Sequence, residues 1–300
     1  MKPIWGGVEA GGTKFVCILA HGYKKIIAQT RFPTTTPLET LTRVKEFIET
    51  NHKGHLAGIG VASFGPLDLN PQSETFGFIT ATPKQGWDNT DLLSPFKNAF
   101  QVPISIDTDV NGAALGEHLW GAAQGIKNFI YLTIGTGIGG GGMVNGQRMH
   151  GLIHPEMGHI RIPHNWDQDP FPGSCPFHGD CLEGLASGSA MQTRWGMPPK
   201  ELPIDHPAWD LEAHYLALGL VNFITTLSPQ RIVMGGGIMQ HPTLMVETRK
   251  KVLGLLGGYI RHPALIEDIS NYIVPPALGD LAGVYGAMGL VMPSQNDQTV

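Results

Sequence analysis

The chain has 300 residues, of which 42% are hydrophobic and 15% are charged, and its formal net charge is −5. This length and apolar content are enough to bury a large core, and the length predicts about two domains. Because positive charge is not in excess, the composition argues against binding to nucleic acid or to an anionic membrane, and we expect a small-molecule ligand.

The first residues, MKPIWGGVEAGG, lack the apolar run of a signal peptide. No later segment is apolar for long enough to span a bilayer. We therefore expect a cytoplasmic protein.

The first part of the chain reads as strands interrupted by single helices. Three strands of an antiparallel meander are predicted over residues 4–8, 15–20 and 26–32. Apolar residues then recur at spacings of three and four, which predicts a helix over 37–51. A strand is expected over 57–64. A further strand, 103–108, leads into a helix over 110–121, with Asp109 at the junction, where ligands meet open α/β sheets.

The second part repeats this order. An apolar strand over 128–135 runs into a glycine turn and a hairpin that contains Asn145 and Gly146. A helix over 210–227, a strand that begins at Arg231 and a helix over 278–292 follow, so the fold class is α/β with two similar lobes.

Two segments lack any periodic pattern. Residues 160–181 are rich in Pro, His, Asp and Gly, which predicts a long loop that something else must order. Residues 293–300 are predicted to fray.

The 40 glycines cluster at 6–12, 135–142 and 235–237, which indicates backbone brought close to a ligand. Gly135 begins a G-x-G-x-x-G pattern after a strand, but no helix is predicted to follow, which disfavours a Rossmann site. This turn, like the one at 11–14, can still present backbone N–H groups to phosphate. A tight hairpin is the alternative for either turn.

Cys175, His178 and Cys181 form a C-x2-H-x2-C pattern that begins sixteen residues after His159. Two sulfurs and two nitrogens match a closed tetrahedral zinc site, which would be structural and would order the loop. With three cysteines the chain does not have a disulfide framework. His154 is a further candidate ligand, although we favour loop packing for it.

Cys17 lies in an apolar strand, so we expect it in the core rather than at a metal site.

Six motifs, in this order along nearly the whole chain, resemble the ROK family of sugar kinases and repressors. They are EAGGTK (9–14), DTDVNGAALGE (107–117), LTIGTGIGGG (132–141), HPEMGH (154–159), CPFHGDCLEG (175–184) and VMGGGIM (233–239). Within the family, EAGGTK, TPKQGW (82–87) and HPEMGH resemble bacterial fructokinases more than glucokinases.

The resemblance implies an actin-like ATPase (ribonuclease H-like) fold, with ATP and sugar in a cleft between two α/β lobes, and a homodimer. It places an N-terminal lobe at 1–118, joined by a C-terminal helix at about 285–300. The C-terminal lobe would span 119–284 and carry the zinc loop at 159–181. The implied cofactors are ATP, Mg²⁺ and structural Zn²⁺.

Asp109 matches the family's catalytic base. A carboxylate at a strand-to-helix junction beside a phosphate turn can accept the proton of an attacking sugar hydroxyl. The alternative is that Asp109 caps a helix beginning at Val110.

The resemblance assigns sugar binding to Thr82, Thr108, Glu156, His159 and Glu183. Thr108 stands where the family usually has Asn. Carboxylates suit vicinal hydroxyls, but the acids at 156 and 183 could also be solvated loop charges.

The residues implied for ATP and phosphate binding are Glu9, Gly11, Gly12, Thr13, Lys14, Thr133, Gly135, Thr136, Gly137, Gly235, Gly236 and Gly237. The last three would lie on the adenine side. Glu9 replaces the usual aspartate and could hold Mg²⁺ through water. Without the resemblance it reads as an exposed turn acid.

The resemblance therefore predicts a fructokinase that converts ATP and D-fructose to ADP and D-fructose 6-phosphate. Glucokinase, mannokinase and N-acetylmannosamine kinase activities remain alternatives, because sequence does not fix pocket geometry. A ROK repressor would carry a helix-turn-helix domain first, and we expect none because the first strand begins within about four residues of Met1. Asp109 argues against a catalytically silent sugar sensor.

Overall fold

The computed structural model describes residues 2–293, and the chain forms two compact units. Within the described residues, the first unit comprises 2–125, 147–155 and 277–293, and the second comprises 126–146 and 156–276. Each unit combines a sheet with helices, in agreement with the predicted α/β class. The finer division into lobes of 1–118 and 119–284 stays a prediction.

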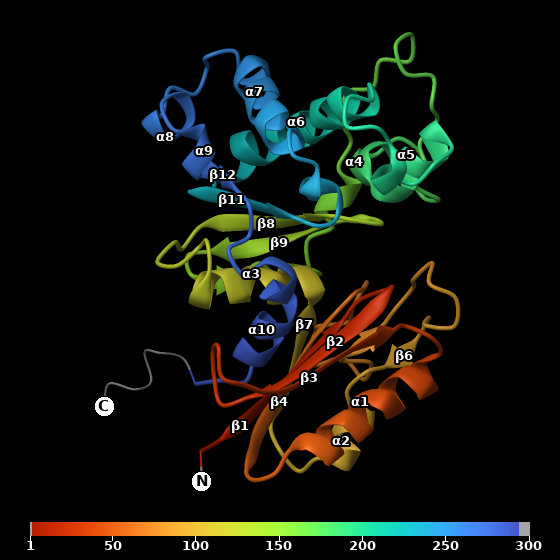
Figure 1. Cartoon of the computed structure of the whole chain (residues 1–300), viewed down its shortest axis with the longest axis vertical. Helices are drawn as coiled ribbons and strands as arrows, with labels where there is room; N and C mark the ends of the chain where they lie inside the picture. Colours follow the sequence, from red (N-terminus) through yellow and green to blue (C-terminus); the bar gives the residue numbers. More distant parts are fainter. Residues whose placement is uncertain (1, 294–300) are drawn as a thin grey trace. The chain divides into compact units, whose positions relative to one another are not determined.

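The first unit is built on a five-stranded sheet in the order β3-β2-β1-β4-β7 (Figure 1). The strands are β1 (Ile4–Ala10), β2 (Lys14–Ala20), β3 (Ile26–Pro33), β4 (Leu56–Ser63) and β7 (Ile104–Thr108). The first three form the predicted antiparallel meander, and β4 and β7 run parallel to β1. Ala10, Ser63 and Thr108 are register partners, so the carboxyl ends of three strands lie at one edge.

The other elements of this unit are α1 (Pro37–Asn51), β5 (Phe78–Ile79), β6 (Thr90–Asp91), α2 (Ser94–Ala99), α3 (Asp109–Trp120), β10 (Gln147–Arg148), η4 (Gly279–Leu281) and α10 (Ala282–Gly289). Helix α1 begins where predicted because Thr36 caps it, with its hydroxyl accepting from the backbone N–H of Glu39. The last helix is shorter than predicted: residues 279–281 form a 3-10 turn, and the predicted continuation over 294–300 lies outside the described residues.

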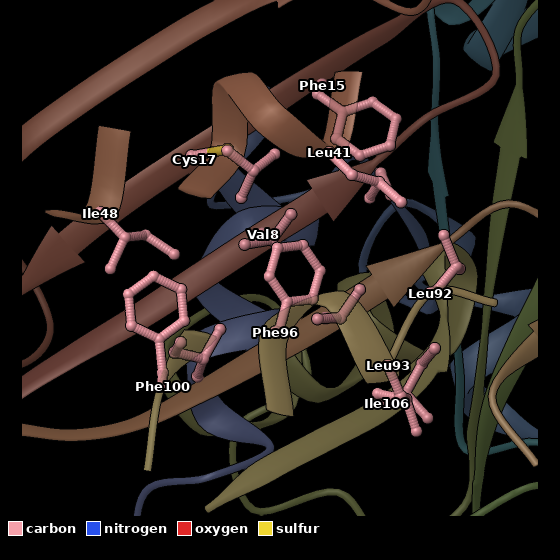
Figure 2. Packing of buried hydrophobic residues seen from close by; sticks show 14 of the residues in the cluster. Val8, Phe15, Cys17, Leu41, Ile48, Leu92, Leu93, Phe96, Phe100 and Ile106 are labelled. Atoms are coloured by element: carbon pink, nitrogen blue, oxygen red, sulfur yellow. The ribbon is translucent and has the colours of Figure 1, made fainter. Parts of the chain in front are cut away.

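Helices α1 and α2 cover one face of this sheet over an apolar core. Figure 2 shows Val8 and Phe15 from the strands packed with Leu41 of α1 and Phe96 of α2. Cys17 belongs to this core with 1% of its surface exposed, which confirms the prediction for it.

Helices α3 and α10 pack on the opposite face with almost no side chain between the backbones. A Cβ on Gly60 would lie 1.7 Å from the Ala287 carbonyl oxygen, and one on Gly286 would lie 1.6 Å from that of Gly112. These glycines are therefore required by backbone packing rather than by a ligand.

The second unit has the strand order β9-β8-β11-β12. Its elements are β8 (Phe129–Ile134), β9 (Ile138–Val144), η1 (Met157–His159), α4 (Leu182–Ala186), α5 (Gly188–Trp195), η2 (Pro199–Glu201), α6 (Ala208–Leu227), β11 (Arg231–Gly235), η3 (Ile238–Gln240), α7 (Leu244–Leu256), α8 (Pro263–Ile266), α9 (Ile269–Tyr272) and β12 (Ile273–Val274). Between His159 and Leu182 the described chain has no helix or named strand, as predicted for this loop.

The glycine run of this unit departs from the prediction of a single turn. Only residues 135–137 form the turn, and Gly139–Gly142 lie inside β9. A Cβ on Gly142 would lie 2.2 Å from the Phe129 carbonyl oxygen, so strand pairing itself requires this glycine. A strand rather than a helix follows the G-x-G-x-x-G pattern, as expected for a turn that is not a Rossmann site.

Over residues 2–293, every helix is too short or too polar to cross a membrane.

Helix α6 buries an acid that has no hydrogen-bond partner among the described residues. Glu212 is 1% exposed, and neither of its carboxylate oxygens accepts a hydrogen bond. Burial raises the pKa of Glu212 well above its usual value, although the positive charge of Arg194 opposes the shift. Folding therefore favours the protonated form of Glu212 relative to the unfolded chain.

We predict that Glu212→Gln makes the stability of the chain less sensitive to a rise in pH. Unfolding releases the Glu212 proton once the pH exceeds the unfolded pKa of about 4.3, so the free energy of unfolding falls as pH rises. Glutamine stays neutral in both states, so the melting temperature of the variant relative to the parent should increase as the pH rises above about 4.3. Glu201→Gln, at an exposed side chain, is the control. The same pH dependence in parent and Glu212→Gln proteins would contradict the prediction.

Candidate active site and metal-binding loop

Asp109 lies where β7 ends and α3 begins. The helix cap is Thr108, whose hydroxyl accepts from the backbone N–H of Asn111 at 3.2 Å. The alternative hypothesis that Asp109 is the cap is therefore wrong, because the preceding residue already fills that role. The Asp109 carboxylate accepts from the Val110 N–H at 2.8 Å. Burial raises its pKa to about 6, although hydrogen bonds from the backbone N–H groups of Val110 and of Asp109 itself oppose the shift.

Thr108 itself is 2% exposed, and its hydroxyl is engaged by the cap. Its assignment as a sugar contact stays a prediction. Thr82 is half-buried in the loop after β5, where its hydroxyl accepts from the Lys84 N–H at 3.3 Å.

Glu9 lies near the same sheet edge, one residue before the end of β1. Its register partner on β4 is Ala62, which in turn pairs with Asp107 of β7. Burial raises the pKa of Glu9 to about 7, the negative charge of Asp109 adds to the shift, and Lys14 opposes it. Its Oε2 atom is buried and has no hydrogen-bond partner among the described residues, so the description of Glu9 as an exposed turn acid is wrong.

The turn after Glu9 is closed by a hydrogen bond from the Gly11 N–H to the Lys14 carbonyl oxygen, at 3.0 Å. A Cβ on Gly11 would lie 2.7 Å from that oxygen, so the tight turn requires glycine here. Residues 11–14, which are predicted to bind phosphate, therefore lie at the same sheet edge as Glu9.

Asp107 was not predicted as a functional residue from the sequence, yet its side chain holds several groups together at this sheet edge. It is fully buried, accepts from Asn111 Nδ2 and His150 Nε2 at 3.0 Å each, and lies 2.7 Å from Arg148 Nε. Burial alone would raise the pKa of Asp107, but the His150 hydrogen bond and the Arg148 charge outweigh it and hold the pKa below its usual value. An ionised Asp107 thus ties residues 148–150 to the start of α3.

His154 packs in the first unit. It is 5% exposed, and its Nε2 accepts from the Leu67 N–H at 3.0 Å. The predicted loop-packing role is confirmed, and the group of metal-ligating side chains does not include His154.

In the second unit, His159, Cys175, His178 and Cys181 converge. Their ligand atoms all lie within 4.8 Å of one another. His159 Nδ1 is 3.7 Å from the Cys175 sulfur and 3.6 Å from the Cys181 sulfur, and His178 Nδ1 is 3.6 Å from the Cys175 sulfur. Tetrahedral zinc with ordinary bond lengths separates a nitrogen from a sulfur ligand by about 3.6 Å, so the donor set fits that ion.

The candidate metal-binding loop, residues 159–181, has a second anchor that was not predicted from the sequence. Asp169, at the middle of the loop, is 5% exposed, accepts from the Tyr215 hydroxyl, and forms an ion pair with Arg194 at 3.1 Å. A single acid in a polar loop gave no sequence signal for this, because its partners come from α5 and α6.

Glu183, in the first turn of α4, connects the metal-binding loop to the glycine turn. Its Oε2 accepts from the Ile138 N–H at 2.8 Å, and its Oε1 lies 4.0 Å from Nε2 of His159. A Cβ on Gly137 would lie 2.6 Å from Oε2. Glu183 is therefore a fixed carboxylate and not a solvated loop charge. Glu156 is exposed, and its carbonyl oxygen accepts from the His159 N–H.

The other predicted nucleotide residues share one edge of the second sheet. Strands β8 and β11 are parallel, and Thr133 pairs with Gly235. Gly236 has φ +97°, and a Cβ there would lie 2.2 Å from the Ile134 carbonyl oxygen, so only glycine fits. The turn 135–137 is held to α5, because the Gly188 N–H donates to the Gly135 carbonyl oxygen at 2.7 Å.

The sequence model of the ROK family matches residues 5–293. The chain belongs to the ROK family.

Known ROK proteins resemble it over nearly their full lengths. A fructokinase of Zymomonas mobilis is 45% identical and the match covers 98% of each chain. A putative fructokinase of Bacillus subtilis is also 45% identical, over 95% of this chain and 94% of its own. The crystal structure of a ROK hexokinase from Thermus thermophilus has a TM-score of 0.77 at 25% identity and covers 96% of this chain and 97% of that one. These matches confirm the predicted actin-like ATPase fold.

Family membership explains why sequence reasoning found some groups and missed others. The ROK motifs contain Asp109, Glu183 and the four candidate metal ligands, and the structure brings these four side chains together as predicted. Asp107 lies inside a motif as well, but its role depends on His150 and Arg148, which no motif includes.

Proposed function

We propose that this ROK protein is a fructokinase, which transfers the γ-phosphoryl group of ATP to the 6-hydroxyl of D-fructose. The observation that carries the proposal is the position of Asp109, a carboxylate at the carboxyl edge of the three parallel strands β1, β4 and β7, which also carries Glu9 and the 11–14 turn. Similarity to fructokinases over nearly the whole chain supports fructose as the acceptor.

Asp109 serves as the general base. Its raised pKa of about 6 leaves it ionised at pH 7, and a carboxylate that is short of hydrogen-bond donors holds a transferred proton well. The attacking 6-hydroxyl would donate to Asp109 as it approaches the γ-phosphorus, so the proton leaves the oxygen while the new P–O bond forms.

Backbone N–H groups of the 11–14 and 135–137 turns are proposed to bind the phosphates, and Gly235–Gly237 to admit the adenine. The orphaned, buried Oε2 of Glu9 fits a role toward a hydrated Mg²⁺. Mg²⁺, when bound, neutralises charge on the transferring phosphate.

Glu156, His159 and Glu183 are proposed to bind the sugar, together with Thr82 and Thr108. The fixed carboxylate of Glu183 beside the His159 ring supports this, because a rigid acceptor selects among hydroxyl patterns. We also propose that the Cys/His group binds zinc, whose chemistry here is structural. The 3.6 to 3.7 Å separations between nitrogen and sulfur donors support zinc.

We predict that Asp109→Asn lowers kcat by about 10² to 10⁴, because the amide cannot accept the proton. Binding of fructose and ATP, measured by calorimetry, should stay near that of the parent, since the base acts in the transition state. Asp88→Asn, at an exposed acid, is the control. Turnover near that of the parent would remove Asp109 from the mechanism.

The same assignment sets the pH dependence. Below about pH 6 Asp109 is protonated, so kcat/KM of the parent should fall about tenfold per pH unit on the acid side. A flat profile between pH 5 and pH 8 would contradict the assignment.

We predict one zinc ion per chain, retained through dialysis. Cys181→Ser should lose the metal and weaken fructose binding, because the loop that leads into Glu183 loses one anchor. Cys17→Ala, which removes a core thiol, should keep it. Metal analysis of the purified proteins gives the count, and full zinc in Cys181→Ser would show that the site is built differently.

We predict a higher kcat/KM for fructose than for glucose, mannose or N-acetylmannosamine in a coupled assay that detects ADP. Fructose differs from glucose near the anomeric carbon, so discrimination depends on hydroxyl contacts that the wrong sugar leaves unpaired. A preference for glucose would replace the acceptor in the proposal while leaving the role of Asp109 intact.

A further inference from the structure

The carboxyl group of Glu9 rests directly on the backbone of Gly283, in the first turn of α10. A Cβ on Gly283 would lie 2.6 Å from Cδ of Glu9 and 2.8 and 2.9 Å from its two oxygens. All three distances are shorter than side-chain contacts allow, so no larger residue fits at 283 with Glu9 in place. Because Oε2 has no hydrogen-bond partner among the described residues, packing rather than hydrogen bonding places that oxygen.

If helix α10 moved away to make this room, it would lose its close backbone contacts with the sheet. A Cβ on Gly7 would lie 2.4 Å from the Val284 carbonyl oxygen, and one on Gly60 would lie 1.7 Å from that of Ala287. The helix backbone therefore rests on strands β1 and β4 along its length. The space for a glutamate at position 9 exists only because position 283 has no side chain.

The position of this carboxyl matters for the proposed reaction. Glu9, Ala62 and Asp107 are register partners across three parallel strands, and Asp109 follows two residues after Asp107. Glu9 therefore lies at the edge that presents the base. Displacement of a group by about 1 Å at such an edge can reduce turnover about a hundredfold.

We propose that Gly283 is a positioning residue for phosphoryl transfer, whose missing side chain sets the place of the Glu9 carboxyl group beside Asp109. The measurement of kcat depends on the proposed kinase function. The measurement of stability depends only on the packing of Gly283 against Glu9.

The test is a double-mutant cycle of Gly283→Ala and Glu9→Asp. In the parent background, with Glu9 present, Gly283→Ala should lower kcat about tenfold or more, with little change in fructose binding. In the Glu9→Asp background the side chain at position 9 is one methylene shorter and leaves room for the new methyl group. There the same substitution should change kcat by less than about threefold, whatever Glu9→Asp costs by itself.

Gly289→Ala is the matched control in the same helix. Its Cβ would lie 2.7 Å from Cδ1 of Leu119, so it also overlaps the end of a flexible side chain, but not Glu9. Its effect should be equal in both backgrounds. The proposal is overturned if Gly283→Ala costs the same in both backgrounds, or costs nothing with Glu9 present.

Melting temperatures of the four cycle proteins provide the second readout. Gly283→Ala should lower the melting temperature with Glu9 present and much less in the Glu9→Asp background. If Gly283→Ala does not fold with Glu9 present, a folded double variant supports the proposal and an unfolded one overturns it. If the parent phosphorylates no sugar, the proposed function fails, while the melting temperatures still decide whether the two positions are coupled.

Discussion

The parallel register of β1, β4 and β7 is the constraint on which the proposed catalytic edge depends. Because Ala10, Ser63 and Thr108 are aligned across the sheet, the chain leaves all three strands at one edge. One strand continues into the 11–14 turn and another into the helix that begins with Asp109. The glycines beneath α3 and α10 maintain this arrangement, since they let two helices rest on the sheet without intervening side chains.

The environment gives three neighbouring carboxyl groups different pKa values. Asp107 is surrounded by donors and a guanidinium, so it remains ionised although it is fully buried. Burial without such partners raises the pKa of Asp109 to about 6 and that of Glu9 to about 7. Acids whose pKa values are pushed apart in this way are suited to separate roles, with Asp107 as an anchor and Asp109 as a proton acceptor.

The candidate metal-binding loop shows how a segment without secondary structure can be held in place by its side chains. At its ends, two histidines and two cysteines converge on a volume that fits a tetrahedral ion. At its middle, Asp169 is held by Arg194 and Tyr215. Glu183 follows directly after the loop and bonds to the backbone of β9, so both anchors contribute to the position of this carboxylate.

The sequence by itself determined the elements that have a local signal. The strand meander, the helix that starts at Pro37 and the irregular loop were all predicted, because side-chain period and capping act over a few residues. The convergence of His159, Cys175, His178 and Cys181 was also predicted, because their spacing in the sequence is typical of a zinc site.

Only the tertiary structure decided which positions can accept no residue larger than glycine, and in which direction the pKa of each buried acid is shifted. Gly142 is required by a neighbouring strand, and Gly286 by a helix whose contacting residue lies more than a hundred positions away. Asp107 and Asp109 are two residues apart in one motif and look equivalent in sequence. Their pKa values shift in opposite directions because His150 and Arg148 reach only Asp107, and a group's protonation depends on what surrounds it in space.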